Sequence, residues 1–246
     1  MSLLGLQRDG SGPLLVWLHG FTQTKATGHT FRSILAGAYE LLTIDLPGHG
    51  ENASVQASLE ETADLLADVL PKEPFILGGY SLGGRVALHV ALRHPERLSR
   101  LALLSATAGI ADNEERRARR ARDEILATRI ETIGTDRFLD EWLAQPMFAT
   151  LAPDALERRA RSSSAEGLAT SLRLSGTGTQ APLGVQLGAL TMPVAAVAGA
   201  RDAKFVLEAE RLGSFIRDAK VDLVPDAGHA AHLERPEACA TALFRI

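Results

Sequence analysis

The sequence lacks the features that mark several classes of protein. It has one cysteine, Cys239, among 246 residues, which excludes a disulfide framework and fits a reducing compartment such as the cytoplasm. No apolar run approaches the roughly 18 residues that a membrane-spanning helix needs. The first residues lack a basic stretch followed by an apolar one, so we expect no signal peptide. These absences predict a cytoplasmic globular protein that does not enter a membrane.

The sequence also gives little indication of a metal site or of a surface that binds nucleic acid. His229 and His232 are three residues apart with no third ligand nearby in sequence, so we expect no metal site. A net charge of −4 argues against nucleic acid as the main partner. Hydrophobic residues make up 46% and charged residues 23%, as in an ordinary globular protein. None of this indicates the oligomeric state.

Lysine is scarce, whereas arginine is abundant in one segment. Only four lysines occur, so 22 of the 26 basic residues are arginine, and eleven of these lie between Arg116 and Arg173. One interpretation is a genome that favours arginine on solvated helix faces. The other is an anion-binding cap over a site. Composition leaves both open.

Short β-type runs alternate with helical stretches along most of the chain. Strands are expected at 13–19, 39–45, 74–80, 98–106, 192–200 and 220–225, and helices at 58–70, 81–94, 204–216 and 234–244. Ser58 and Glu61 form a capping-box pattern at the start of one helix. This alternation predicts an α/β fold with a mainly parallel sheet flanked by helices.

The alternation breaks in the middle of the chain. From about residue 109 to residue 187 the sequence is helical and arginine-rich, with no strand-like run. We therefore expect a helical lid at 109–187, inserted into a core made of 1–108 and 188–246. An insertion of this kind covers a site at the carboxyl edge of the strands.

A serine between glycines is the strongest catalytic signal. Gly79-Tyr80-Ser81-Leu82-Gly83 matches G-x-S-x-G between a predicted strand and a predicted helix. Glycine suits the flanking positions because side chains would collide in so tight a turn. The pattern predicts that Ser81 is a nucleophile or base at a helix N-terminus; the alternative is a glycine-rich turn with a bystander serine.

Such a serine needs an imidazole and a carboxylate, which follow it in the order acid, then histidine. Asp202 comes directly after a predicted strand, and His229 lies in the loop after the last one. Asp226 and His232 compete with them on spacing alone. We expect Ser81, Asp202 and His229 to form a triad.

Two further segments surround the serine. "WLHGF" (17–21) ends a strand and is similar to loops that supply an oxyanion-hole N–H, here from Phe21, with Leu82 supplying the other. His19 is expected to be a structural hydrogen-bonding residue beneath this loop. Arg85 follows Ser81 by four residues, so both side chains share one helical face. A cation there would suit a carboxylate substrate; the alternatives are a surface arginine or a salt bridge to an acid of the lid.

The arginine-rich helix has its own periodicity. At about 100° per residue, an apolar stripe is expected on Ala118, Ala121, Ile125 and Leu126. Arg122 falls within this stripe and Arg119 at its edge, so these two are expected to point inward, where a guanidinium needs an anion. For Arg122 an internal salt bridge to Asp123 or Glu124 is the alternative.

Across nearly the whole chain the sequence resembles the 2-succinyl-6-hydroxy-2,4-cyclohexadiene-1-carboxylate (SHCHC) synthases of menaquinone biosynthesis, which have the α/β-hydrolase fold. The segments that carry the resemblance are "LHGF", "DLPGHG", "GYSLGGRVAL", "AGIADNEERRARRARD", "EWLAQPMFATL", "GARDAKF" and "AGHAAHLERP". The resemblance implies the triad and oxyanion hole above. It also implies that Arg85, Arg119 and Arg161 bind substrate carboxylates and that Tyr80 and Trp142 line the pocket. A solvated arginine beside Arg158 and Arg159 is the alternative for Arg161.

The reaction implied by this resemblance is a carbon–oxygen elimination. Pyruvate leaves 2-succinyl-5-enolpyruvoyl-6-hydroxy-3-cyclohexene-1-carboxylate, a small polycarboxylate, without a metal or organic cofactor. His229 would deprotonate Ser81, whose alkoxide removes a ring proton. Other hypotheses are a serine carboxylesterase or carbon–carbon bond hydrolase acting on an anionic substrate, a lyase of a different anion, and a receptor that binds without turnover.

Overall fold

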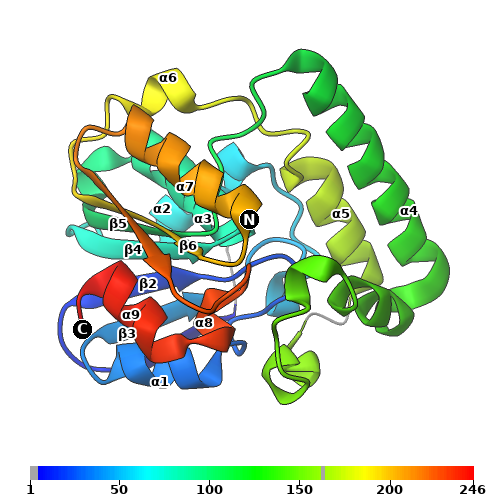
Figure 1. The fold of residues 1–246 in the computed structure, drawn as a ribbon, viewed down its shortest axis with the longest axis horizontal. Coiled ribbons are helices and arrows are strands. Elements are labelled where there is room, and N and C mark those ends of the chain that lie inside the picture. The colour runs from blue at the N-terminus through cyan, green and yellow to red at the C-terminus, as the bar shows by residue number, and fades with distance from the viewer. Residues whose placement is uncertain (1–4, 162–163) are drawn as a thin grey trace.

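The computed structural model describes residues 5–161 and 164–246, and within them seven strands form one sheet (Figure 1). Their order is β1-β3-β2-β4-β5-β6-β7. β1 is antiparallel to β3, and all other neighbours are parallel. The strands are β1 (Leu6–Gly10), β2 (Leu14–Leu18), β3 (Glu40–Ile44), β4 (Phe75–Tyr80), β5 (Leu98–Leu104), β6 (Val194–Gly199) and β7 (Ala219–Val224). The predicted mainly parallel sheet is confirmed.

Helices cover both faces of this sheet. α2 (Leu59–Val69), α3 (Leu82–Arg93) and α7 (Ala203–Phe215) pack on one face, and α1 (His29–Ala36), α8 (Ala231–Glu234) and α9 (Pro236–Phe244) on the other. Successive residues of β2 alternate between the two layers: Val16 and Leu18 contact the first, Leu15 and Trp17 the second. A strand buried on both faces reads as one continuous apolar run, which is why "LLVWL" predicts a central strand.

The ends of the core helices follow from local chemistry. Ser58 caps α2, since its hydroxyl accepts from the Glu61 N–H at 3.2 Å and its own N–H donates to the Glu61 carboxylate at 2.8 Å. α3 ends at Arg93, two residues before Pro95, whose ring prevents the helix from continuing. The capping box expected from sequence is confirmed.

The middle of the chain forms a helical insertion, which we define as residues 109–187. Its two long helices are α4 (Asn113–Leu143), which is kinked at Gly134, and α5 (Ala165–Ser175); a short α6 (Gly184–Leu187) follows. In Figure 1, α4 and α5 run side by side next to the sheet. The part of 109–187 that the structure describes contains no strand, as predicted. No helix of the described chain is long and apolar enough to cross a membrane.

The predicted apolar stripe of α4 is wrong. Ala118, Ala121 and Ile125 are exposed, Ile125 by 70%, and Leu126 is half-buried. Instead, Ala127 and Ile130 pack against α5 through Leu168, Ala169 and Leu172. Hydropathy periodicity locates an apolar face but does not tell whether that face meets another helix or a cavity. Here Ile125 and Leu126 line a cavity.

Candidate active site

Ser81 occupies a strained turn between β4 and α3. Its φ is +52°, in the left-handed region that favours glycine, and its N–H donates to the Leu104 carbonyl at 2.8 Å. A side chain at Gly83 would overlap the Leu18 carbonyl, so the helix approaches β2 only because glycine is there. This geometry presents the Ser81 hydroxyl at the N-terminus of α3, above the carboxyl ends of the strands.

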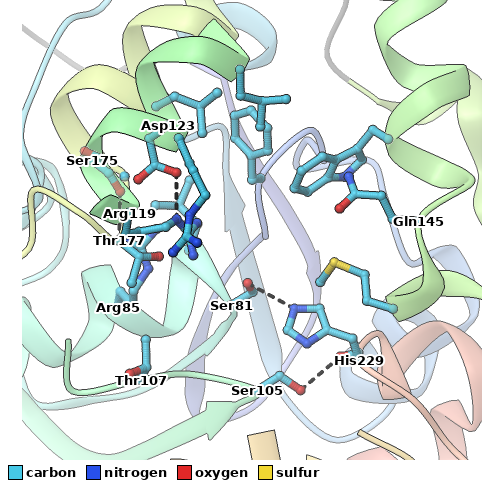
Figure 2. Close-up of a pocket in the computed structure, with 18 of the residues that line it drawn as sticks. Ser81, Arg85, Ser105, Thr107, Arg119, Asp123, Gln145, Ser175, Thr177 and His229 are labelled. Carbon is cyan, nitrogen blue, oxygen red and sulfur yellow. Dashed lines mark hydrogen bonds and ion pairs between the residues drawn. The ribbon is translucent and has the colours of Figure 1, made fainter. Parts of the chain in front are cut away.

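Ser81, His229 and Asp202 form one hydrogen-bonded chain. The His229 Nδ1–H donates to Asp202 Oδ2 at 2.8 Å, because an ionised carboxylate can only accept. Nε2 is therefore the unprotonated nitrogen, and it lies 3.3 Å from Ser81 Oγ, where it can accept the hydroxyl proton. Figure 2 shows the imidazole pointing at the serine. The arrangement can make the serine oxygen a base or a nucleophile.

Neighbouring groups fix the orientation of the imidazole. The Ser105 hydroxyl donates to the His229 carbonyl at 2.9 Å (Figure 2), and the ring of Phe205 lies 4.4 Å from the imidazole between centroids. Asp202 is held in turn by the Phe205 N–H, which donates to Oδ1 at 3.3 Å at the start of α7. The His229 side chain is 2% exposed, so its contacts with Asp202 and Ser81 are largely shielded from water.

The two competing residues lie elsewhere. Asp226 makes an exposed ion pair with Arg201 at 2.6 Å. His232 is buried, stacks near the Tyr80 ring at 4.4 Å and contacts Gln23 instead of Ser81. The structure therefore brings together the three residues expected from the order of the motifs and separates the alternatives.

A cavity of about 680 Å³ opens above Ser81, between the core and the helical insertion. One wall, which we call the cationic wall, is polar and carries Arg85, Arg119, Thr107, Ser175 and Thr177 (Figure 2). The opposite wall, which we call the apolar wall, is formed by Phe21, Trp142, Met147 and Phe148. Ser81 and His229 lie between these walls at the floor. The volume suits a small organic molecule with both charged and apolar parts.

Arg85 is a buried cation in the cationic wall. It is 7% exposed, and its Nη1 donates to the Ser175 carbonyl at 2.8 Å. Burial lowers its pKa to about 10, and the nearby charge of Arg119 lowers the pKa further while Asp123 opposes this. Among the described residues, no carboxylate pairs with Arg85. A guanidinium that remains charged at neutral pH without a counter-ion favours an anionic ligand.

The guanidinium of Arg119 is held in place through its Nε alone among the described contacts. Its Nε donates to Asp123 Oδ1 at 2.7 Å, while Asp123 Oδ2 accepts the Gly178 N–H at 3.1 Å. The terminal nitrogens of Arg119 face the cavity on the same side as Arg85 (Figure 2). Arg122 also lines the cavity, but it is exposed and pairs with neither Asp123 nor Glu124 in the described structure. The alternative interpretation of Arg122, an internal salt bridge to Asp123 or Glu124, is therefore not seen among the described residues.

The apolar wall is an aromatic cluster. Trp142 packs edge-on against Phe21, with centroids 5.2 Å apart, and lies near Phe138 and Phe148 at 5.9 and 6.0 Å. Tyr80 lines the cavity beside Ser81, and burial raises the pKa of its phenol, so the phenol stays neutral. Both residues that the resemblance assigned to the pocket lining, Tyr80 and Trp142, do line it.

The two expected oxyanion donors lie on either side of the serine. Phe21 follows β2, and Leu82 is the first residue of α3; both line the cavity. Within the described residues, neither main-chain N–H has a hydrogen-bond acceptor. Free amides at a turn and at a helix N-terminus can stabilise negative charge on a bound oxygen.

Arg161 is buried but does not line this cavity in the described structure. It is 6% exposed, so it is not a solvated arginine like its neighbours. Its Nε donates to the Leu156 carbonyl at 2.8 Å and its Nη1 to the Thr22 hydroxyl at 2.9 Å, while Nη2 has no partner among the described residues. Burial lowers its pKa to about 10, and Tyr80 and Glu157 oppose this shift. These protein oxygens hold Arg161 close enough to Tyr80 for the two groups to affect each other's pKa.

Several residues that line the cavity were given no functional role from the sequence. Phe148 and Phe205 stand in "QPMFATL" and "GARDAKF", segments that carried the resemblance without being assigned a role. Asp123 follows Arg119 by four residues, a spacing that pairs side chains on a helix and would have indicated the contact. Ser175 and Thr177 left no signal, because they reach the cavity only through the packing of α5 on α4.

The described parts of the chain contain no cluster of three or more histidine, cysteine, aspartate or glutamate residues that could hold a metal ion. The polar groups that line the cavity include a serine, a histidine paired with a carboxylate, and arginines. This set is suited to acid–base or acyl chemistry on an anionic molecule.

Comparisons with known proteins agree with this geometry. The model of the alpha/beta hydrolase family matches residues 15–242. A putative SHCHC synthase of Bacillus subtilis (strain 168) is 35% identical over 90% of this chain and 85% of its own, and the SHCHC synthase of Enterobacter sp. (strain 638) is 34% identical over 100% and 96%. The solved structure of MenH from S. aureus superposes with a TM-score of 0.90 at 30% identity, covering 96% of this chain and 94% of its own.

Proposed function

We propose, because this chain belongs to the SHCHC synthase family of α/β hydrolases, that it eliminates pyruvate from 2-succinyl-5-enolpyruvoyl-6-hydroxy-3-cyclohexene-1-carboxylate. One observation carries the proposal: the hydrogen-bonded chain of Ser81, His229 and Asp202 opens into a cavity whose wall presents Arg85 and Arg119. A neutral ester would leave Arg85 without a counter-ion and the terminal nitrogens of Arg119 without an acceptor, whereas a polycarboxylate supplies an anionic acceptor for each.

In the proposed mechanism, Ser81 is the base that touches the substrate. His229 Nε2 accepts the Ser81 hydroxyl proton, and the resulting alkoxide abstracts a proton from the ring. The electrons of that C–H bond shift through the ring, and the C–O bond to the enolpyruvyl group breaks. The leaving enolate takes up the proton from the imidazolium and becomes pyruvate, while Ser81 keeps the ring proton as its hydroxyl. Asp202 stabilises the transient imidazolium and fixes its tautomer.

Charge in the substrate explains the cationic wall. A carboxylate that enters a cavity loses water, and fixed guanidinium donors must replace it. Arg85 and Arg119 are placed to bind substrate carboxylates in this scheme, with Arg161 joining them through its unpartnered Nη2 if Tyr80 moves aside. Trp142 and Tyr80 would pack on the ring, and the Phe21 and Leu82 amides would stabilise the negative oxygen.

In the same proposal, residues 109–187 act as a lid on a core of residues 1–108 and 188–246, and the enzyme works in the cytoplasm. The buried free thiol of Cys239 agrees with a reducing compartment. The cavity lies between these two parts of the chain, so movement of the insertion would admit substrate and release product.

The test measures pyruvate release in a single turnover by the wild type, Ser81→Ala and Arg119→Ala. At subsaturating concentrations, where the rate reports kcat/KM, we expect each variant to lose at least about two orders of magnitude, as when a general base or a charge clamp is removed. A short-chain p-nitrophenyl ester assay runs in parallel. Fast ester turnover that persists in Arg85→Ala, with no pyruvate formed, would instead identify a carboxylesterase. Full function in Ser81→Ala would identify a receptor.

A further inference from the structure

Two buried side chains, those of His19 and Gln23, hydrogen-bond to Gly20 in the loop that bears Phe21. The proposed reaction uses neither of them. Residues 20–23 form a tight turn in which the Gln23 N–H donates to the Gly20 carbonyl at 3.1 Å and Thr22 has a φ of +67°. Positive φ at the third position is the signature of a type II turn. In such a turn the N–H of the second residue, here Phe21, is left free.

The direction of that N–H is set by the carbonyl of the preceding residue. His19 Nε2 accepts the Leu46 N–H at 3.0 Å, so its Nδ1 carries the proton and donates to the Gly20 carbonyl at 2.8 Å. The Gly20 carbonyl and the Phe21 N–H belong to one planar trans peptide and point in opposite directions. Holding the carbonyl toward His19 therefore turns the Phe21 N–H away from it.

Gln23 holds the other side of Gly20 and reaches across the molecule. Its Oε1 accepts the Gly20 N–H at 3.0 Å, which assigns the amide orientation, so its Nε2 is a donor. That Nε2 lies 3.3 Å from Nε2 of His232, 209 residues away in sequence. The imidazole must accept there, because both side chains are 2% exposed and burial lowers the pKa of His232 to about 3, keeping the ring neutral.

His232 connects this contact to the rest of the site. Its ring lies 4.4 Å from the Tyr80 ring, and a Cβ on Gly20 would lie 2.5 Å from the same tyrosine ring. His232 also follows His229 by three residues, at the start of α8. One buried cluster thus contacts the Phe21 loop, the residue before Ser81 and the segment that carries the imidazole.

We propose that Gln23 and His232 form a positioning bridge that holds Gly20 by its N–H, so that the following Gly20–Phe21 peptide presents the Phe21 N–H to the reacting oxygen. Neither residue is catalytic, since neither lines the cavity. This inference rests on the proposed function, because it assigns Phe21 a role in stabilising the charge that develops there. The bridge places the donor in register with Ser81 and His229 before substrate binds.

The variants are chosen to separate positioning from general damage to the fold. Gln23→Ala removes both contacts, and His232→Ala removes the acceptor. His232→Gln keeps an acceptor for the Gln23 amide, so it is the rescue variant. His94→Gln is the matched control, since this histidine follows the C-terminal end of α3, pairs with Asp64 of α2 and does not line the cavity. Thermal unfolding of each variant establishes which of them are folded.

We expect kcat for pyruvate release to fall about 10-fold in Gln23→Ala and His232→Ala, with KM changed less than about 2-fold. This is milder than the loss of a whole oxyanion donor, because the turn itself remains. His232→Gln should return to within about 3-fold of wild type, and His94→Gln should match it. Wild-type kcat in both alanine variants, a loss confined to KM, or equal impairment of folded His232→Gln and His232→Ala would overturn the bridge.

Two further measurements keep this test separate from that of the proposed reaction. Phosphorylation of Ser81 by paraoxon, which forms the Oγ–P bond and releases p-nitrophenolate, places a developing oxyanion near the same donors without any pyruvate chemistry. A crystal structure of Gln23→Ala reports the Gly20–Phe21 peptide directly. If the wild type releases no pyruvate but that peptide rotates in the variant, the reaction is wrong and the bridge stands. If pyruvate is released and the peptide keeps its orientation, the bridge alone is wrong.

Discussion

The floor of the cavity and its cationic wall differ in the charge and the hydrogen bonding of their polar side chains. On the floor, Ser81, His229 and Asp202 are hydrogen-bonded to one another. The deeply buried histidines nearby are neutral: His19, His49 and His232 all have a lowered pKa, chiefly because of burial. In the cationic wall, Arg85 and Arg119 keep their charge and leave donors unused toward the cavity. Proton transfer needs fixed tautomers, whereas recognition of an anion needs charge without a partner.

This contrast separates two tasks within one pocket. Loss of a floor residue should lower kcat, because the transition state loses an aligned group. Loss of a wall residue should mainly raise KM, because ground state and transition state both lose a counter-ion. The predictions below test whether the division holds, from the largest expected effect to the smallest.

The sharpest test compares two neighbouring arginines of α4. Arg119→Met removes a cavity-facing charge at similar size, and we expect kcat/KM for pyruvate release to fall about 100-fold, mainly through KM, as for a charge-assisted contact in a closed site. The KM of the wild type should also rise with salt more steeply than that of the variant. Steady-state kinetics at two ionic strengths measure both effects.

Arg120→Met is the matched control for this prediction. Arg120 adjoins Arg119 in sequence but lies on the other side of α4, facing the groove toward Arg173. It should leave kcat/KM within about 2-fold of wild type, as a solvated charge does. Equal losses in the two variants would mean that the general charge of α4, and not the cavity wall, determines affinity.

Asp123 should have an intermediate effect, because it acts through Arg119. Asp123→Asn breaks the 2.7 Å contact with Arg119 Nε and leaves a neutral group beside Gly178. We expect kcat/KM to fall about 10-fold through KM, and the free energy of unfolding to fall by about 1–3 kcal/mol, as when a buried hydrogen-bonded charge is removed. Kinetics with urea unfolding measure both. An unchanged KM would show that Arg119 needs no fixed orientation.

Trp142 tests the apolar wall. Trp142→Leu keeps an apolar side chain but loses the ring contacts with Phe21, Phe138 and Phe148. We expect KM to rise about 5- to 10-fold, since aromatic pairs contribute about 0.5–1.5 kcal/mol beyond burial. The salt dependence of KM should stay as in the wild type. A change in salt dependence would contradict the separation between the two walls.

Much of the core and the placement of Ser81, Asp202 and His229 at one edge of the sheet could be predicted from the sequence. The strong signals were local: an apolar run for a buried strand, Ser58 and Glu61 for a helix start, and G-x-S-x-G between a strand and a helix. Asp202 and His229 followed from their positions after strands, because parallel strands bring their carboxyl ends to one edge. β1 was missed, since a short edge strand with alternating exposure carries little hydropathy signal.

The helical insertion was less predictable, for a physical reason. Its helices were expected, but the buried face of α4 was misjudged: Ile125 is exposed at the cavity, while Asp123 is buried. A core helix packs on a sheet whose apolar face selects its orientation. α4 instead packs on one helix and borders a cavity, so polar and apolar side chains both turn inward. Likewise, the burial of Arg161 depends on Thr22 and Leu156, which no local pattern connects to it.

His232→Gln should have the smallest effect on activity. Its main effect should be on the pH dependence of the free energy of unfolding, which tests the protonation state of His232. Burial lowers the pKa of His232 to about 3, so the folded ring stays neutral while the unfolded ring, with a pKa near 6.5, takes up a proton as the pH falls. The unfolded state then binds more protons, and the free energy of unfolding decreases below about pH 6.5.

His232→Gln removes one such proton, so between pH 6 and 4 its free energy of unfolding should fall less steeply than that of the wild type, by about 1.4 kcal/mol per pH unit. His49 has the same lowered pKa of about 3 and remains in the variant, so part of the slope should persist. Urea unfolding across this range measures the difference, and parallel slopes would mean that the His232 ring is protonated in the folded protein, contrary to its role as an acceptor from Gln23.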